Sequence, residues 1–261
     1  MTHQRIARSS LTAATVLLVL AMARSALTQA WTPVASMPTR RAGFVAAVFD
    51  GRIYAIGGID DTESGKVTLT AVEIYDPATD TWTVGTAMPT ARGGATYCVL
   101  DGRIYVIGGK LGYWEDATTA VEAYDAATDT WTGLSPMPTA RYVPAVVVRD
   151  GKIAAIGGCK GVGDGESPYT PVRAVEVYDP QTDTWDERAP YPPLAEGEIA
   201  HMRVASYAQE GPIPVISWNP IRGKIGRALA YDLDANTWTE RAPMPVERES
   251  SGMCVWRGES S

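Results

Sequence analysis

The chain has 261 residues, of which 45% are hydrophobic and 20% are charged. This composition predicts a globular protein with a sizeable core and excludes a disordered one. The formal net charge is −7, and because the first 30 residues hold three arginines and no acid, the rest of the chain has 20 basic against 30 acidic residues. Such an acidic surface repels phosphate backbones, so we expect no nucleic acid among the partners.

The counts of histidine and cysteine limit the chemistry further. There are two histidines, His3 near the N-terminus and His201 in the body of the chain, which excludes any site that needs two or three imidazoles. The three cysteines, Cys98, Cys159 and Cys254, allow at most one disulfide. The sequence contains no motif of a serine hydrolase, a zinc protease or a nucleotide-binding loop. We therefore expect neither a cofactor nor a metal.

Residues 1–30 have the pattern of a secretory signal peptide. Arg5 and Arg8 precede an apolar run of 13 residues at 11–23, and small residues that suit a cleavage site come after it. We expect a mature chain that begins near Trp31 and is exported, either secreted or periplasmic. The alternative is an uncleaved anchor, but 13 residues fall short of the ~20 that span a bilayer, so no stable membrane insertion is expected after cleavage.

Tryptophan marks an internal repeat in the rest of the chain. Five of the eight tryptophans recur at spacings of 49 to 54 residues, and the last four follow Tyr-Asp at a fixed offset. Met-Pro follows four of the five, and an arginine lies ten residues beyond the same four. The tryptophans are Trp31, Trp82, Trp131, Trp185 and Trp238, and the arginines are Arg41, Arg92, Arg141 and Arg248.

Taken in chain order, each unit is predicted to contain four short strands. The first unit has strands at 44–49 and 52–56, joined by Asp-Gly, which is typical of a type I′ hairpin, and then at 71–75 and 81–83. A double glycine ends its second strand. The next two units begin with strands at 95–100 and 103–107, and at 144–148 and 152–156. The fourth unit has Ala195 in place of the arginine and no double glycine, and Pro214 weakens its second strand at 213–216.

A four-stranded unit cannot bury both faces alone, so the units must stack around an axis. The sequence therefore predicts an all-β fold: a β-propeller of four-stranded antiparallel blades, four blades plus an incomplete fifth, open or imperfectly closed. The units run at about 37–87, 88–136, 137–190 and 191–243, with a partial unit at 244–261 and a lone outer strand at 31–36. The edges of the incomplete blade predict self-association, and the alternative is a truncated fragment of a longer propeller.

An apolar run, Gly-Gly, Tyr-Asp and Trp at a period near fifty resembles the kelch repeat family, and the resemblance covers residues 31–256. It implies a propeller of four-stranded blades that often serves as a protein-interaction platform and in some members is an enzyme. The shared motif is the signature of a blade and identifies no site. Kelch-type oxidases with a copper centre need two histidines, which His201 alone cannot supply.

In the first three units, all of the variation in repeat length lies between the second and third strands. These connections are expected on one face of the propeller together with those from the fourth strand to the next first strand, and variable loops on a fixed scaffold are where binding residues are expected. Aromatic residues there favour recognition, and acidic neighbours favour a basic or hydroxyl-rich ligand. The candidate ligand-binding residues are Arg40, Asp60, Asp61, Glu63, Tyr113, Trp114, Glu115, Asp164, Glu166 and Tyr169. The alternatives are solvated loops without a ligand, or Ca²⁺ binding by the acids, although no EF-hand pattern is present.

The repeated arginines allow two interpretations. They could form a cationic ring that binds a carboxylate, but a residue that recurs in every blade is more economically a structural element. We prefer the structural role, with Glu73, Glu122 and Glu176 as partners. For the cysteines, we expect Cys98 and Cys254 in the core and Cys159 to be accessible.

These observations favour an exported, non-catalytic binding module for a protein or glycan partner, with no catalytic residue assigned. The kelch resemblance implies an alternative, a carbohydrate-active enzyme of the sialic acid mutarotase type. In that enzyme the arginines would hold a carboxylate, and Glu63 or Glu166 would move protons.

Overall fold

The computed structural model describes residues 31–62, 65–112, 117–161, 170–193, 201–204, 211–219 and 224–242. The predicted signal peptide and the partial unit at 244–261 lie outside these residues. The chain divides into two compact units, Met1–Ser36 and Met37–Ser261. Residues 31–36 carry no regular secondary structure, in contrast to the outer strand expected there. Across the described ranges there is no helix long and apolar enough to cross a membrane.

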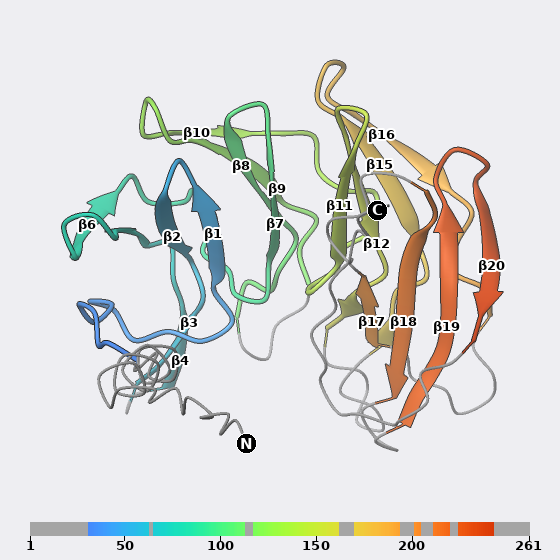
Figure 1. Cartoon of the computed structure of the whole chain (residues 1–261), viewed down its shortest axis with the longest axis horizontal. Coiled ribbons are helices and arrows are strands. Elements are labelled where there is room, and N and C mark those ends of the chain that lie inside the picture. The colour runs from blue at the N-terminus through green and yellow to red at the C-terminus, as the bar shows by residue number, and fades with distance from the viewer. Residues whose placement is uncertain are drawn as a thin grey trace, which may run out of the picture. The chain divides into compact units, whose positions relative to one another are not determined.

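Among its described residues, the second unit contains four sheets of four antiparallel strands each, and within every one of these sheets the strands follow chain order (Figure 1). Blade 1 consists of β1 (Val45–Phe49), β2 (Arg52–Ile56), β5 (Val72–Asp76) and β6 (Thr81–Gly85). Blade 2 consists of β7 (Thr96–Leu100), β8 (Arg103–Ile107), β9 (Val121–Asp125) and β10 (Thr130–Gly133). Blade 3 consists of β11 (Ala145–Arg149), β12 (Lys152–Ile156), β15 (Val175–Asp179) and β16 (Thr184–Arg188). Blade 4 consists of β17 (His201–Val204), β18 (Ile213–Asn219), β19 (Lys224–Asp232) and β20 (Thr237–Arg241). The prediction of an all-β fold built from four-stranded propeller blades is confirmed.

The tight turns form as their residues predict. In the three Asp-Gly hairpins both central residues have positive φ, for example 47° at Asp50 and 71° at Gly51, as a type I′ turn requires. Pro214 lies in the central strand β18, where it is paired with Ala230 of β19. That the proline weakens this strand stays a prediction.

The core lies between successive blades. Alternate residues of each strand point to opposite faces, so each blade presents one apolar face to the preceding blade and one to the following blade. Three buried clusters result, which join blade 1 to blade 2, blade 2 to blade 3, and blade 3 to blade 4. Their most deeply buried members include Ile56, Ile104 and Val106, then Ile107, Ile153 and Ala155, then Val147, Val215 and Tyr231.

The repeated tryptophan and aspartate hold neighbouring blades together through the backbone. Trp131 Nε1 donates to the carbonyl of Thr86 in blade 1 (2.8 Å), and the carboxylate of Asp129 accepts from the N–H of the same Thr86 (2.7 Å). The Tyr124 hydroxyl also donates to Asp129 (2.5 Å), and its ring lies against Trp131 with centroids 5.0 Å apart. The same pair of hydrogen bonds joins blade 3 to blade 2 at Ser135. It also joins blade 4 to blade 3 at Ala189. Asp129, Trp131 and their equivalents are therefore elements of the contact between blades, and Tyr124 supports them from within its own blade.

Candidate functional site

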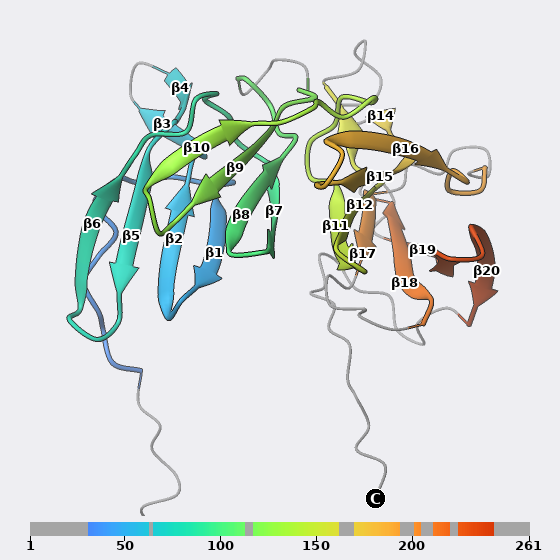
Figure 2. The same ribbon diagram turned by 90° about the horizontal axis from the view of Figure 1, so that it is seen from above.

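The connections between the second and third strands of a blade, where binding residues were predicted, contain short paired strands in blades 1 and 3. In blade 1 the connection forms a hairpin of β3 (Ile59–Thr62) and β4 (Gly65–Thr68), and in blade 3 it forms β13 (Cys159–Lys160) and β14 (Thr170–Pro171). Figure 2 shows the β3–β4 hairpin beyond one end of the blade 1 sheet. The loop face is defined as these connections together with the segments 40–43, 91–94 and 140–143, which enter the inner strands.

Backbone bridges fix the loop face in blades 1, 2 and 3. The entering segment pairs with the start of the second-to-third connection at Ala42 and Ile59, and the N–H to O distances are 2.9 Å in both directions. Gly93 and Lys110 in blade 2, and Tyr142 and Cys159 in blade 3, form the same bridge. The two groups of loops therefore do meet on one face, as the strand order predicted.

The structure brings together three of the sequence-predicted residues, all in blade 1. Arg40 Nε lies 3.4 Å from Asp60 Oδ1, and the same guanidinium donates to the backbone carbonyl of Asp61. Lys66 on β4 pairs with the Asp61 carboxylate at 3.8 Å. Arg40 has 75% of its side chain exposed, so this cluster is a polar surface and its ion pairs contribute little stability. The other predicted residues of this face, Glu63, Tyr113, Trp114, Glu115, Asp164, Glu166 and Tyr169, lie outside the described residues.

One residue of the loop face has a strained backbone. Gly43 and Gly94 have φ of 58° and 65°, and the equivalent residue in blade 3 is Val143, with φ of 46°. A β-branched residue in this region is an outlier, and such strain is common at functional positions. The N–H of Val143 donates to the carbonyl of Gly94, and the N–H of Gly94 to that of Gly43, both at 2.7 Å. The contacts between blades thus hold Val143 in this conformation.

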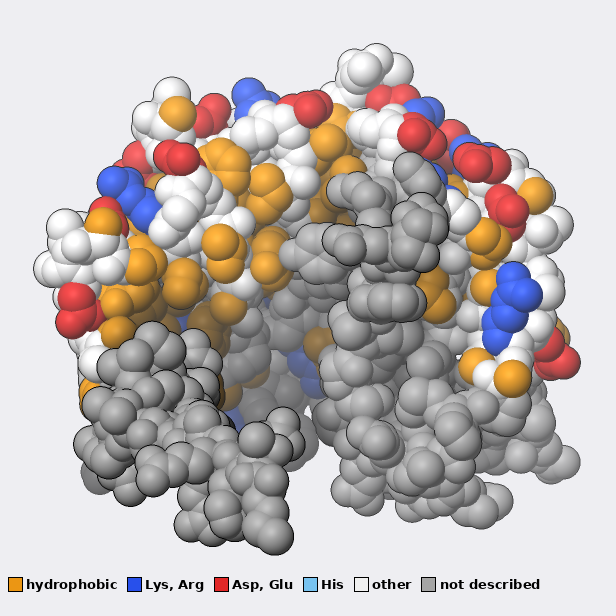
Figure 3. Space-filling model, in the orientation of Figure 1, with side chains coloured by type: hydrophobic (Ala, Val, Ile, Leu, Met, Phe, Trp, Pro, Cys, Tyr) orange, Lys and Arg blue, Asp and Glu red, His pale blue; other side chains and the backbone are white. Residues whose placement is uncertain are grey.

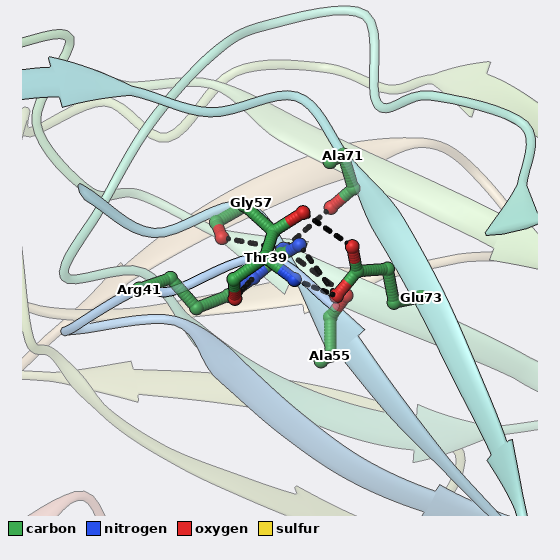
Figure 4. Close-up of polar contacts among 6 residues, drawn as sticks. All are labelled: Thr39, Arg41, Ala55, Gly57, Ala71 and Glu73. Atoms are coloured by element: carbon green, nitrogen blue, oxygen red, sulfur yellow. Dashed lines mark hydrogen bonds and ion pairs between the residues drawn. The ribbon is translucent and has the colours of Figure 1, made fainter. Parts of the chain in front are cut away.

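The repeated arginines Arg41, Arg92 and Arg141 are fully buried. Arg41 Nη1 donates to the carbonyls of Gly57 and Ala71, both at 3.0 Å, and Nη2 lies 2.9 Å from Glu73 Oε2 (Figure 4). The equivalent ion pairs are 2.5 Å long between Arg92 and Glu122 and 2.6 Å long between Arg141 and Glu176. All three arginine side chains are 0% exposed. Arg248 lies outside the described residues.

Burial and the partner charge act on these arginines in opposite directions. Desolvation lowers the pKa of Arg92 and of Arg141, and Glu122 and Glu176 respectively raise it. A buried charge of this kind is tolerated only when it is paired. The sequence of blade 4 agrees: Ala195 replaces the arginine, and Leu229 stands where the glutamate would be, nine residues before Trp238. Both charges are lost together.

The double glycine recurs because its second residue donates a hydrogen bond to the backbone carbonyl of the repeated arginine in the next blade. Gly58 N–H donates to the carbonyl of Arg92 in the next blade, and Gly109 N–H to that of Arg141, both at 3.0 Å. The threonine two residues before the repeated arginine also contacts the buried glutamate, and this partner was not predicted from the sequence. Thr39 and Thr90 donate their hydroxyls to Glu73 and Glu122, at 2.5 and 2.7 Å. The repeated Thr-x-Arg spacing was the available signal.

The expectation for Cys159 was wrong. Its side chain is buried, at 1% exposure, because its backbone pairs with Tyr142 on one side and with Pro171 on the other. Burial raises the pKa of its thiol to about 11, so at neutral pH it is protonated and a poor nucleophile. Cys98 is a buried core residue, as predicted, and both cysteines are free thiols. Within the described ranges, no group of three or more His, Cys, Asp or Glu side chains could hold a metal ion.

Comparison with known proteins gives a consistent result. The family model described as KLHDC2/KLHL20/DRC7 Kelch-repeats domain matches residues 13–158, and the one described as Kelch motif matches residues 140–190. Kelch-like protein terF of Aspergillus terreus is 29% identical over 240 residues, which is 89% of this chain and 51% of that protein. Kelch-like ECH-associated protein 1B of Danio rerio is 37% identical over 83 residues, which is 32% of this chain and 14% of that protein. The chain thus spans about half or less of these relatives.

A solved structure, titled "Structure of YjhT", superposes with a TM-score of 0.62 at 16% sequence identity. The superposition covers 84% of this chain and 76% of the other. At that identity the likeness concerns the fold alone, and it supports the propeller architecture.

Proposed function

Because the chain belongs to the kelch-repeat family, we propose that it is an exported, non-catalytic interaction module that binds a protein partner through the loop face. One observation carries the proposal: equivalent positions of the loop face differ between blades, whereas the opposite face repeats nearly identical turns. Arg40 corresponds to Ala91 and Ala140, and Asp60 corresponds to Leu111 and Lys160. A rigid scaffold with position-specific surface residues suits recognition of one partner.

The name of one relative supports a protein partner. The Danio rerio relative is named for an association with ECH. The described repeat arginines do not support the alternative of an acidic-sugar enzyme, because Arg41, Arg92 and Arg141 have no exposed side chain with which to hold a carboxylate. A glycan partner would use the same face.

Charge reversal on each face tests the proposal. The exported protein is cross-linked to its partner in native secretions, and the partner is quantified by mass spectrometry for the wild type, Arg40→Glu and Arg103→Glu. Both arginines are exposed and each forms one ion pair with an aspartate, Arg40 with Asp60 on the loop face and Arg103 with Asp125 at the opposite end of its blade. We expect Arg40→Glu to lower recovery of the partner at least about tenfold and Arg103→Glu to leave it unchanged. Equal losses, or no partner for the wild type, would contradict the proposal.

We also propose that a second copy covers the open face of blade 1. Figure 3 shows hydrophobic side chains gathered over the inner strands of the first two blades. Val48 is 64% exposed, whereas its counterparts Val99 and Val148 are partly buried against the preceding blade. Apolar surface of this kind favours association.

Sedimentation equilibrium measures this self-association. The wild type should show a mass that rises with concentration, and Val48→Lys should be a monomer. The control is Val67→Lys, at a similarly exposed valine on the β3–β4 hairpin, which should associate like the wild type. A monomeric wild type at all concentrations would refute self-association without affecting the loop-face proposal.

A further inference from the structure

Exposed apolar side chains gather on the loop face. Within the described part of the second unit, five large hydrophobic side chains are exposed. Three of them lie on the loop face: Val67 on β4, Leu111 in the connection of blade 2, and Val143 in the segment that enters blade 3. The other two, Val48 and Val84, lie on the inner and the outer strand of blade 1. Single exposed apolar residues are common on protein surfaces, so exposure alone does not identify a binding residue.

Val143 differs from the other four because its backbone is strained. Its φ is 46°, whereas the equivalent residues Gly43 and Gly94 are glycines, which adopt this left-handed conformation without a steric penalty. At Gly94 an added Cβ would meet no atom closer than 3.6 Å. Space for a side chain is therefore available at this position, and only the backbone conformation disfavours it. Blade 3 carries a strained valine where the other two blades use glycine.

The surrounding groups hold Val143 in a fixed position at the junction between blades 2 and 3. Its N–H donates to the carbonyl of Gly94 (2.7 Å), and the preceding residue, Tyr142, is bridged to Cys159. The buried ring of Tyr142 has the Lys110 ammonium 4.2 Å from its centroid. The Val143 side chain is nevertheless 41% exposed. A stiff side chain on a fixed backbone loses little conformational entropy when a partner covers it.

We propose that Val143 is an apolar anchor of the loop face, and that it packs against an aliphatic or aromatic side chain of the protein partner. This inference rests on the proposed function and names one contact of it. Backbone strain persists where the surrounding structure enforces it, and it clusters at sites that bind. Leu111, the residue after Lys110, supplies a second exposed apolar side chain on the blade 2 side of the junction.

Thermal unfolding separates a binding role from a structural one. Val143→Gly should unfold at the same temperature as the wild type or up to about 4 °C higher, because glycine relieves the strain. Val84→Gly is the matched control, since Val84 is an exposed valine in β6 with ordinary strand conformation, and it should unfold about 1–4 °C lower. A decrease for Val143→Gly as large as that for Val84→Gly would mean that Val143 is kept for stability, which overturns the proposal.

Gly94→Ala measures the strain itself. It places a side chain in the same left-handed conformation without a steric clash, so the backbone alone is tested. We expect the unfolding temperature to decrease by about 2–6 °C. An unchanged unfolding temperature would show that this position accepts any residue freely, and the valine in blade 3 would then carry no argument for binding.

Short peptides are the probe for the partner side chain. They are selected from a random library on the immobilised full chain, synthesised with a fluorescent label, and titrated by anisotropy. We expect each bound peptide to contain an aliphatic or aromatic residue whose replacement by alanine weakens binding. Val143→Gly should lower the affinity at least about tenfold, and Val84→Gly should leave it unchanged. On the Val143→Gly variant, the alanine replacement in the peptide should have little further effect, because the two side chains are coupled.

Arg40→Glu separates this inference from the proposed function. If Arg40→Glu weakens the peptides and Val143→Gly does not, the loop face binds without this anchor, and only the role of Val143 is overturned. If neither variant weakens them, the loop face is not the binding surface and the proposed function fails as well. If no peptide is selected, the anchor is overturned, and the cross-linking experiment above decides the protein partner independently.

Discussion

Replacing Arg141 by Met is expected to lower the free energy of unfolding by about 3–5 kcal/mol, because it leaves Glu176 charged and buried without its partner. The two side chains are 0% and 1% exposed, and their charged atoms are 2.6 Å apart. The substitution also removes the donor to the carbonyls of Gly157 and Ala174. Urea unfolding followed by tryptophan fluorescence measures the loss.

The sequence of blade 4 suggests a second substitution that should restore most of the lost stability. Arg141→Met combined with Glu176→Leu removes both charges, as in blade 4, where Leu229 occupies the glutamate position. We expect the double variant to recover most of the loss, although not all, because the carbonyls stay without their donor. Arg103→Met is the control, since its ion pair with Asp125 is exposed and its loss should cost less than about 1 kcal/mol. Equal stability of Arg141→Met and Arg103→Met would show that the buried pair is not structural.

Substitution of Gly108 by Ala is expected to destabilise the protein by about 3 kcal/mol, the sum of backbone strain and a steric clash. Gly108 has φ of +65°, and an added Cβ would lie closer than 3.0 Å to the carbonyl oxygen of Arg141. That carbonyl cannot move freely, because it accepts a hydrogen bond from Gly109 N–H. Thermal and urea unfolding of the variant measure the loss.

Gly133→Ala is the matched control for this substitution. Gly133 lies in the same blade, at the end of β10, with an ordinary φ and no atom within 4 Å of an added Cβ. We expect it to be neutral or to stabilise by up to about 1 kcal/mol, through loss of flexibility in the unfolded chain. If Gly108→Ala were as stable as Gly133→Ala, the double glycine would not be needed for the approach of the next blade.

Much of the fold could be predicted because its signals are local and recur. The strand at 52–56, its Asp-Gly turn and the double glycine depend on backbone conformation and on the alternation of apolar residues, and the repeated copies reinforce each other. The hairpin at 59–68 was not predicted, because its strands are polar on both faces and carry no alternation.

The candidate site was less predictable than the blades. The recurrence of Arg41 and its equivalents identified a structural element, but only the contacts revealed Thr39 as a further partner of Glu73. Cys159 was expected to be accessible because it follows a double glycine, and the bridge to Tyr142 buries it instead.

The sequence alone predicted the architecture: a repeated four-stranded unit, the conformations of its turns, and the glutamates Glu73, Glu122 and Glu176 as partners of the repeated arginines. These features arise from local chemistry and from the inability of one blade to bury both of its faces alone. Which polar residues are buried and which face solvent was visible in the three-dimensional structure and not in the sequence, because burial depends on the neighbouring blade. The structure placed the repeated arginines in the interior, and Arg40 and Lys160 on the face where a partner can reach them.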